Sequence, residues 1–275
     1  MVMHRSVRRE CKMKFTIHGV RGSVPTPGVK FLKYGGNTSC FEIETNNTQI
    51  FCDAGTGFRS AKLLREEKNV CVFFTHFHHD HIQGLPFNND LFPEGTKICI
   101  SSALYDKQTT RAVLQQYFSA CFFPVNIFEN LNHLSVQSFD DAKDALKRDV
   151  DISFINLKHP GGAVGYSFVK ESKKVVILLD NEFQEPQLDG LSEFCKDADI
   201  LIWDGMFTKD ELLGKRGWGH SSIEQAEEFT KLCDVKKTVI CHHAPYRSDT
   251  DIDELKARIS SGRISFGCEK MSFDI

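Results

Sequence analysis

Residues 75 to 81 place several potential metal ligands in one short stretch, Thr-His-Phe-His-His-Asp-His. His76 and His78 are two residues apart, so in an extended chain their imidazoles point the same way and can bind one metal ion. Asp80 and His81 lie on the turn beyond and can bind a second ion. Neutral imidazoles with a carboxylate suit Zn²⁺, Mn²⁺ or Fe²⁺. His79 belongs to neither set, and we expect it at the surface.

Four further residues could complete such a site, because most of them come directly after an apolar run. His159, Asp180 and His242 each follow a strand-like segment. His220 stands ahead of a helix-like segment, in Trp-Gly-His-Ser-Ser. Each of these alone has an ordinary structural interpretation as a turn residue, a strand-end residue or a neighbour of a helix N-terminus. Together with the cluster they predict a two-metal site.

The elements that must position these residues are mainly short strands. We expect strands at 14–20, 41–45, 49–53, 70–75, 97–101, 151–157, 164–170, 174–179, 199–203 and 237–241. We expect helices at 58–68, 104–118, 187–196, 221–233 and 251–260, and leave 122–150 unassigned. Strands first, and then strands mixed with helices, indicate an α/β protein with two sheets and helices outside them.

Length and composition fit one large α/β domain. The chain has 275 residues, of which 41 % are hydrophobic and 26 % charged, which excludes disordered, collagen-like and coiled-coil chains. No apolar run approaches the ~18 residues of a transmembrane helix, so no membrane partner is expected. Ten scattered cysteines without a C-x-x-C pair indicate reduced thiols and a cytoplasmic protein. Residues 1–12 lack the apolar segment of a signal peptide, so we expect a disordered extension ahead of a single domain at 13–275.

Over residues 13–275 the sequence resembles the metallo-β-lactamase fold hydrolases. The strand that runs into His-x-His-x-Asp-His carries the resemblance, and the order of His159, Asp180 and His242 agrees with it. The segments GHSSIEQA at 219–226 and CHHAPYR at 241–247 resemble motifs of the tRNase Z-like phosphodiesterase branch, and DAGTG at 53–57 resembles its aspartate-glycine turn. The resemblance implies an αββα four-layer sandwich.

This resemblance also implies a role for each candidate residue. Two divalent cations, with Zn²⁺ as the first expectation and Mn²⁺ as the alternative, would hold a water or hydroxide as the nucleophile. We assign catalysis to Asp80 and to His220, the latter as general acid, while Asp53 would hold a metal ligand from behind by hydrogen bonds. His243 remains an alternative to its neighbour as a ligand. By position, the first metal takes His76, His78 and His159, the second takes Asp80, His81 and His242, and Asp180 bridges the two.

A small phosphodiester, such as a cyclic nucleotide, is the expected substrate. His220 with its serine pair favours phosphodiester chemistry, whereas a thioester hydrolase of the glyoxalase II type would lack that histidine. The tRNA processors of the family carry a long arm between the third histidine and the bridging aspartate, but His159 and Asp180 are only 21 positions apart here. The net charge of −3 also argues against long nucleic acid as a partner.

Other functions remain open. They are an RNA-processing ribonuclease of the tRNase Z type, a thioester hydrolase, a di-iron oxidoreductase and a metal-binding protein without turnover. Members of this fold that have lost activity usually lose ligands, whereas every ligand position is filled here. We also expect a homodimer, as in relatives, with the unassigned segment 122–150 as the contact.

Two groups of residues are candidates for substrate contacts. Phe122 and Phe123 belong to an aromatic stretch on which a nucleobase could stack, although the same rings could equally be core or a dimer contact. Four polar residues lie in loops that we expect to rim the site and could hold a phosphate: Arg21, Asn37, Thr38 and Arg247.

Overall fold

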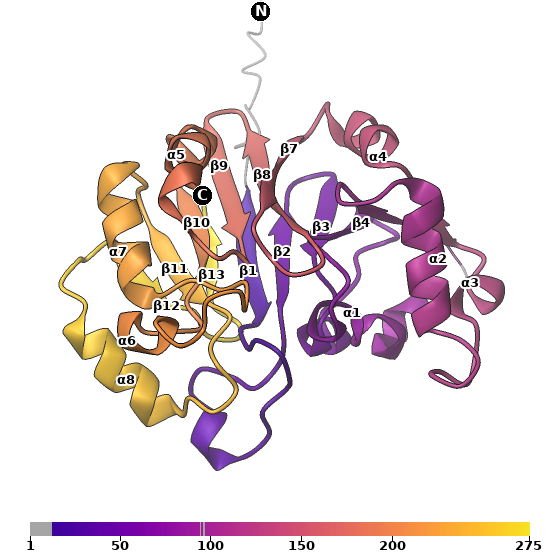
Figure 1. Cartoon of the computed structure of the whole chain (residues 1–275). Coiled ribbons are helices and arrows are strands. Elements are labelled where there is room, and N and C mark those ends of the chain that lie inside the picture. Colours follow the sequence, from indigo (N-terminus) through magenta and orange to yellow (C-terminus); the bar gives the residue numbers. More distant parts are fainter. Residues whose placement is uncertain (1–12, 94, 96) are drawn as a thin grey trace, which may run out of the picture.

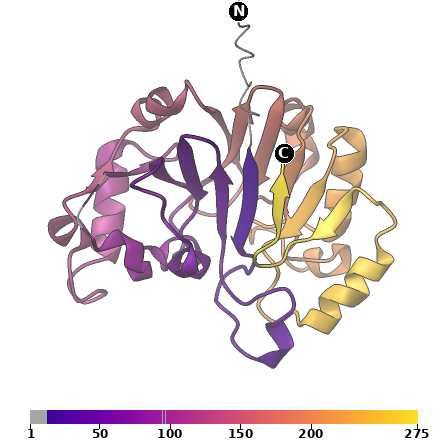
Figure 2. The same cartoon turned by 180° about the vertical axis from the view of Figure 1, so that it is seen from behind.

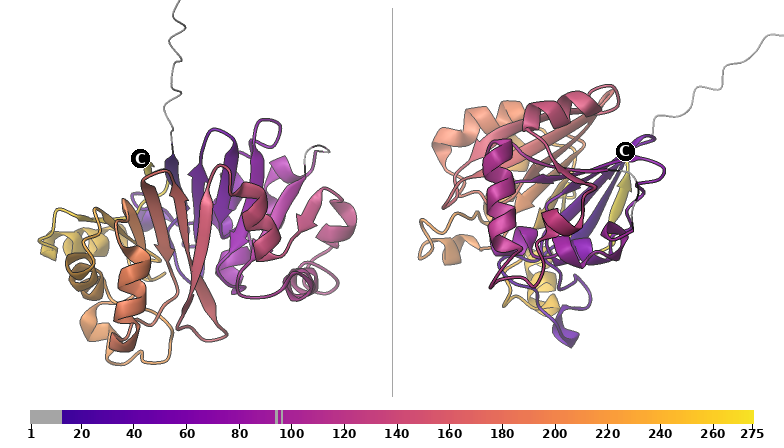
Figure 3. Two further views of the ribbon diagram at one scale, coloured as in Figure 1. Left: turned by 90° about the horizontal axis from the view of Figure 1, so that it is seen from above. Right: turned by 90° about the vertical axis from the view of Figure 1, so that its right-hand side faces the viewer.

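Two stacked sheets form the centre of the molecule, and helices cover their outer faces (Figure 1). The computed structural model describes residues 13–93, 95 and 97–275. The expected disordered extension at 1–12 lies outside this range. The predicted αββα arrangement is confirmed, and Figure 3 shows the strands of the two sheets in separate layers.

The first sheet has seven strands in the order β13-β1-β2-β3-β4-β5-β6. Strands β1 to β3 are antiparallel, whereas β3 to β6 run parallel. The last strand pairs with the first, so the C-terminus lies beside β1 (Figure 2). The bounds are β1 (Lys14–Gly19), β2 (Cys40–Glu44), β3 (Thr48–Cys52), β4 (Asn69–Phe74), β5 (Ile98–Ser102), β6 (Leu134–Val136) and β13 (Ser272–Asp274).

The second sheet has six strands in the order β12-β11-β10-β9-β8-β7. Its first half in the chain, β7 to β9, is antiparallel, and β9 to β12 are parallel. The bounds are β7 (Asp151–Leu157), β8 (Ala163–Lys170), β9 (Lys173–Leu178), β10 (Ile200–Asp204), β11 (Thr238–Cys241) and β12 (Ile264–Phe266).

Capping side chains fix where several helices begin. The hydroxyls of Ser222 and Ser248 accept hydrogen bonds from the third residue of α7 and α8, and Asp106 does the same for α2. The helices are α1 (His79–Ile82), α2 (Lys107–Tyr117), α3 (Ile127–Asn130), α4 (Phe139–Leu146), α5 (Leu188–Cys195), α6 (Lys209–Leu212), α7 (Ile223–Leu232) and α8 (Asp249–Arg258). Short 3-10 helices lie at Val29–Phe31, Thr56–Ser60, Leu85–Phe87, Asn89–Leu91 and Glu185–Gln187.

Strand β4, which leads into the histidine cluster, is buried on both faces. Phe73 points into the apolar layer between the sheets, and Phe74 points outward, where it packs in the layer that includes Leu114 of α2. This alternation is the period-two geometry of a strand. The Tyr166 hydroxyl of β8 donates to the backbone oxygen of Phe74 at 2.9 Å, which ties the two sheets together beside the cluster.

The prediction of a helix at 58–68 is wrong. The chain forms a short 3-10 helix at Thr56–Ser60 and then becomes extended at Ala61. Side chains from distant segments take up the backbone groups that a helix would need. The Asn88 amide donates to the backbone oxygen of Ala61, and the backbone NH of Leu64 donates to Gln49. These tertiary hydrogen bonds replace the internal ladder of a helix.

The unassigned segment 122–150 holds α3, β6 and α4, and the three-residue strands β12 and β13 were not expected. The described cysteines are free thiols, and most of them are buried. Within the described ranges, no helix is both long and apolar enough to cross a membrane.

Candidate metal centre

The candidate ligands gather at one edge of the two sheets, where several strands end. In the first sheet β3 and β4 are parallel, so Asp53 and His76, which come after them, lie at the same edge. In the second sheet β9, β10 and β11 are parallel, which brings Asp180, Asp204 and His242 together. The carboxyl ends of parallel strands are the usual place for a binding site in an α/β sheet. Each sheet thus supplies part of one site.

Asp180 lies at the middle of a group of imidazoles. Its carboxylate is 3.1 Å from His81 Nε2 and 3.4 Å from His242 Nε2. It is 3.6 Å from His159 Nε2 and 3.9 Å from His76 Nε2. In a tetrahedral zinc site, with bonds of about 2.0–2.1 Å, neighbouring ligand atoms lie about 3.3 Å apart. The spacing around Asp180 therefore suits cations held between these atoms.

The structure brings all seven predicted ligands together. Their ligand atoms fall into sets whose members lie within 4.8 Å of one another. One set is His76, His78 and His159, a second is Asp80, His81 and His242, and Asp180 joins His76 and His81 between them. This is the division that the family resemblance implies.

Several of these atoms are buried without a hydrogen-bond partner among the described residues: His76 Nε2, His81 Nε2, His242 Nε2 and Asp180 Oδ2. A buried polar atom that lacks a partner costs stability, and a cation would satisfy each of them. Imidazole nitrogens and carboxylate oxygens are ligands for Zn²⁺ and Mn²⁺. The residues present therefore fit a pair of divalent cations.

In two of the imidazoles the second ring nitrogen contacts a group outside the ligand sets. His159 Nδ1 donates to the backbone oxygen of Gly219 at 2.8 Å, and His76 Nδ1 is 3.1 Å from the hydroxyl of Thr75. Burial lowers the pKa of His76 well below its ordinary value and lowers that of His159 as well. Both effects favour the neutral, oriented imidazole that binds a metal.

Asp53 supports the cluster from behind, at the end of β3. Its carboxylate accepts from His81 Nδ1 at 2.8 Å, and from the backbone NH and the hydroxyl of Thr75, each at 2.8 Å. Complete burial raises the pKa of Asp53, and the hydrogen bonds from His81 and Thr75 oppose that rise. Asp53 thus lies behind the ligand cluster, hydrogen-bonded to His81.

His220 lies against the same cluster and is paired with Asp204. The carboxylate of Asp204 accepts from His220 Nδ1 at 2.8 Å, and the Asp180 carboxylate is 3.8 Å from the same nitrogen. Burial alone would lower the pKa of His220, but Asp204 and then Asp180 outweigh burial and raise it to about 9. His220 therefore carries a proton at neutral pH and is oriented by one carboxylate.

Three residues at strand ends adopt a left-handed backbone. Asp53, Asp180 and His242 have φ angles of 63°, 54° and 57°. A non-glycine residue in this region costs about 1–3 kcal/mol and persists only where its surroundings hold it. The chain turns sharply at each of these positions, which coincide with the site.

The tandem histidines after β11 have separate places. His242 lies in the cluster, with Nε2 3.4 Å from the Asp80 carboxylate. His243 points elsewhere and donates from Nε2 to the backbone oxygen of Gly267 at 3.0 Å. Burial lowers the pKa of His243 to about 3, so it is a neutral residue of the interior. The geometry therefore favours His242 as the ligand.

The structure corrects the expectation that three polar loop residues hold substrate. Arg21 is fully buried, and its guanidinium donates to backbone oxygens that include that of Arg247 at 2.6 Å. Arg247 is itself committed to Glu211, at 2.6 Å. Thr38 is also fully buried, and its hydroxyl accepts from the backbone NH of Thr56. Through these hydrogen bonds all three buried side chains fasten loops behind the site.

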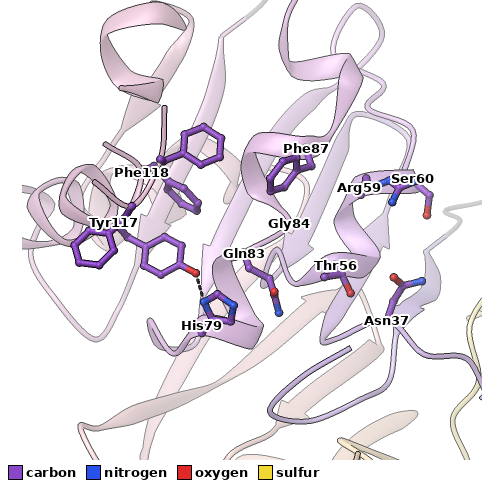
Figure 4. A pocket seen from close by; sticks show the side chains of 12 residues that line it. Asn37, Thr56, Arg59, Ser60, His79, Gln83, Gly84, Phe87, Tyr117 and Phe118 are labelled. Carbon is purple, nitrogen blue, oxygen red and sulfur yellow. Dashed lines mark hydrogen bonds between the residues drawn. The ribbon is translucent and has the colours of Figure 1, made fainter. Parts of the chain in front are cut away.

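A cavity of about 600 Å³ opens beside α1, next to the ligand cluster (Figure 4). Phe122 and Phe123 line it, as does Asn37 from the predicted polar residues. His79 is exposed, as expected, and its Nδ1 is hydrogen-bonded to the Tyr117 hydroxyl within the cavity. The lining also contains Thr56, Arg59, Ser60, Gln83, Gly84, Phe87 and Phe118.

Sequence reasoning missed two carboxylates that organise the site. Asp204 ends the apolar run Ile-Leu-Ile-Trp-Asp of β10, a signal equal to that of the predicted strand-end residues. Glu182 accepts from the backbone NH groups of Gly217 and Gly219, at 2.6 and 3.2 Å, and so holds the loop that carries His220. No motif in the sequence marks Glu182.

Comparison with known proteins gives concordant matches. The family model of the Beta-lactamase superfamily domain matches residues 48–243. Ribonuclease Z of Bacillus subtilis (strain 168) is 25 % identical over 242 residues, which cover 71 % of this chain and 77 % of that protein.

Solved structures are similar over nearly the whole chain. The short form of human tRNase Z has a TM-score of 0.66 at 18 % identity and covers 94 % of this chain and 98 % of its own. A diphosphatase from the PhnP family has a TM-score of 0.69 at 16 % identity and covers 96 % and 97 %. At these identities the likeness is one of fold. Because the family model also spans most of the sequence, this chain belongs to the β-lactamase superfamily and has the fold of the metallo-β-lactamase hydrolases.

Proposed function

We propose that this protein is a phosphodiesterase that uses two divalent cations to hydrolyse small phosphodiesters such as cyclic nucleotides, with His220 as general acid. The observation that carries the proposal is the His220–Asp204 pair, with its 2.8 Å hydrogen bond, beside two sets of metal ligands. A thioester releases a thiolate, which leaves without a proton. An alkoxide leaving group from a phosphodiester needs one, and a positioned acid supplies it.

The residues divide the work of such a reaction. When bound, the two cations would supply a nucleophilic water at neutral pH and neutralise charge on the phosphoryl oxygens. His76, His78 and His159 would hold one cation, and Asp80, His81 and His242 the other, with Asp180 shared. Asp204 keeps the His220 proton-donating ring in one orientation, since it occupies Nδ1 and leaves Nε2 to face the departing oxygen.

Two further observations support a small substrate. Strands β8 (Ala163–Lys170) and β9 (Lys173–Leu178) form a tight hairpin between His159 and Asp180, which leaves no length for a protruding arm. The net charge is −3, whereas proteins that grip long nucleic acid usually carry a basic excess. The similarity to ribonuclease Z and to a PhnP-family diphosphatase supports chemistry at phosphorus.

The test is hydrolysis of a substrate panel by the purified protein loaded with Zn²⁺ or Mn²⁺. The panel contains bis(p-nitrophenyl) phosphate and the 2′,3′- and 3′,5′-cyclic nucleotides. Asp80→Ala should abolish cleavage of all of them. His220→Ala should slow the cyclic nucleotides by about 10²–10⁴-fold and bis(p-nitrophenyl) phosphate much less, because p-nitrophenolate leaves without protonation.

A matched control is Asp144→Ala, since Asp144 is an exposed aspartate that pairs with Lys147 on the surface; its activity should equal that of the native protein. No cleavage of any phosphodiester, with two cations per chain found by elemental analysis, would overturn the proposal. Cleavage of a thioester in its place would favour the glyoxalase II type of activity.

The second candidate function is a ribonuclease of the tRNase Z type, favoured by the curated relatives, which carry the name ribonuclease Z. Precursor tRNA belongs in the same assay. If precursor tRNA is cleaved with a far higher kcat/KM than any cyclic nucleotide, the substrate is RNA and not a small phosphodiester.

A further inference from the structure

The cavity beside α1 shares that helix with the metal ligands. Asp80 and His81 of α1 are buried and face the ligand cluster. His79 and Gln83, four positions apart and therefore on one face of the helix, line the cavity instead. The cavity and the ligand cluster therefore adjoin one another across a single helical turn.

The cavity has an aromatic part and a polar part. Figure 4 shows Tyr117, Phe118 and Phe87 around one side, and Thr56, Arg59 and Asn37 on the other. Some of these rings face solvent although they are apolar, since Phe87 is 55 % and Phe122 69 % exposed. A volume of about 600 Å³ is within the range of small-molecule sites.

The polar lining has unused hydrogen-bonding capacity. Tyr117 occupies Nδ1 of His79, so the ring is held and its Nε2 remains available on the side of Gln83 (Figure 4). The amide nitrogen of Gln83 is 3.5 Å from the hydroxyl of Thr38, and its amide oxygen has no hydrogen-bond partner among the described residues. Within the described part of the chain, the guanidinium of Arg59 has no hydrogen bond or ion pair although it borders the cavity.

We propose that this cavity binds the nucleobase of a nucleoside phosphodiester, with Phe122 and Tyr117 stacking on the base and His79 and Gln83 contacting its polar edge. The inference rests on the proposed function and adds the substrate class and the residues that select it. A nucleobase combines a flat aromatic face with a rim of donors and acceptors, which is what the aromatic part and the His79–Gln83 face offer. Arg59 gives the cavity a cation suited to an anionic substrate.

The test compares two substrates that share a scissile bond and differ only in the base: nucleoside 2′,3′-cyclic phosphates and methyl riboside 2′,3′-cyclic phosphate. For the native protein the base should lower KM by about tenfold, which is within the measured range for stacking of one base. Phe122→Ala should raise KM for the nucleoside substrates by about tenfold and leave the riboside unchanged. Free nucleosides should inhibit riboside cleavage competitively in the native protein and only weakly in Phe122→Ala.

Two further variants sharpen the result. Tyr117→Phe keeps the ring and removes the hydroxyl that holds His79, so KM differences among the bases should narrow. Phe92→Ala is the matched control, because Phe92 is 54 % exposed and lines the neighbouring apolar cavity but not this one. It should behave as the native protein does.

The outcomes separate this inference from the proposed function. If neither the riboside nor bis(p-nitrophenyl) phosphate is cleaved, the phosphodiesterase itself fails. If both are cleaved but the base does not lower KM, or Phe122→Ala and Tyr117→Phe change nothing, the phosphodiesterase stands and the base-binding cavity is refuted. An effect of Phe92→Ala without one of Phe122→Ala would refute it too, and would move the base to the neighbouring cavity.

Discussion

Asp204 determines what His220 can do, although it lies outside the recognisable motifs. Its carboxylate accepts from the backbone NH groups of Met206 and Asn181, at 3.1 and 3.3 Å, in addition to His220 Nδ1. The carboxylate is therefore fixed by the backbone before it orients the imidazole. A charged acceptor at Nδ1 also stabilises the protonated ring, which is the form that a general acid needs.

Replacement of this acceptor should separate catalysis from metal binding. In Asp204→Asn the negative charge is lost while the side-chain volume stays, so His220 loses its proton more easily and its orientation is no longer fixed. We expect kcat on cyclic nucleotides to fall by about 100-fold or more, with KM nearly unchanged and two cations still bound. Steady-state kinetics together with elemental analysis measure both. Loss of a cation would instead identify Asp204 as a ligand.

At the scale of elements, α6 and the loop after β11 are joined into one unit. Arg247 joins them, since its guanidinium donates to the Glu211 carboxylate at 2.6 Å and to the backbone oxygen of Met206 at 3.2 Å. Burial would raise the pKa of Glu211, but the hydrogen bonds from Thr208 and Arg247 lower it. Glu211 is thus ionised at neutral pH, and its ion pair with Arg247 holds α6 and the loop after β11 together.

Arg247→Met should therefore lower stability and spare substrate binding. We expect a loss of about 2 kcal/mol in the free energy of unfolding, with KM unchanged, measured by urea denaturation and kinetics. Because the pKa of folded Glu211 is depressed, its pairing stabilises the protein above the ordinary glutamate pKa of about 4.3 and is lost as the pH falls through the folded value. The difference between native protein and variant should shrink there. Arg216→Met, at an exposed arginine, is the control and should change little. A raised KM would instead indicate that Arg247 contacts the substrate.

The ends of the strands could be predicted from the sequence, whereas contacts between segments distant in the sequence could not. Apolar runs that stop at His or Asp located β4, β9 and β11 and their ligands, because burial and alternation are local properties. The segment 58–68 has a helical spacing, yet Gln49 and Asn88 capture its backbone. The three-residue strands β6, β12 and β13 exist only because a neighbouring strand offers partners, as Lys14 does to Asp274. The cavity side chains come from separate helices and loops, and apart from His79 they belong to no metal-ligand motif.

For the whole molecule, the site joins the two sheets. His76, Asp80 and His81 follow strands of the first sheet, whereas His159, Asp180 and His242 follow strands of the second. Asp180 Oδ2 and several imidazole nitrogens are buried with no hydrogen-bond partner among the described residues. Cations that bind this arrangement and not the unfolded chain stabilise the fold as a whole.

Metal removal should therefore lower the melting temperature. Zn²⁺ at a free concentration about a thousand times its Kd stabilises the folded protein by about 4 kcal/mol. Its removal by a chelator should therefore lower the melting temperature by roughly 10 °C for a protein of this size. Calorimetry with and without chelator measures the shift. In Asp180→Asn, which keeps the volume and loses the shared charge, added Zn²⁺ should raise the melting temperature far less. An equal shift in both proteins would place the stabilising metal elsewhere.

The left-handed backbones of Asp53, Asp180 and His242 have a consequence for the evolution of this chain. At each position a glycine would relieve a strain of about 1–3 kcal/mol, which is less than the roughly 4 kcal/mol that bound cations contribute. Laboratory selection for heat resistance with metal present should therefore keep Asp180 and His242. The same selection under a chelator, without a requirement for activity, should collect glycine at these two sites, and the resulting proteins would no longer hold metal.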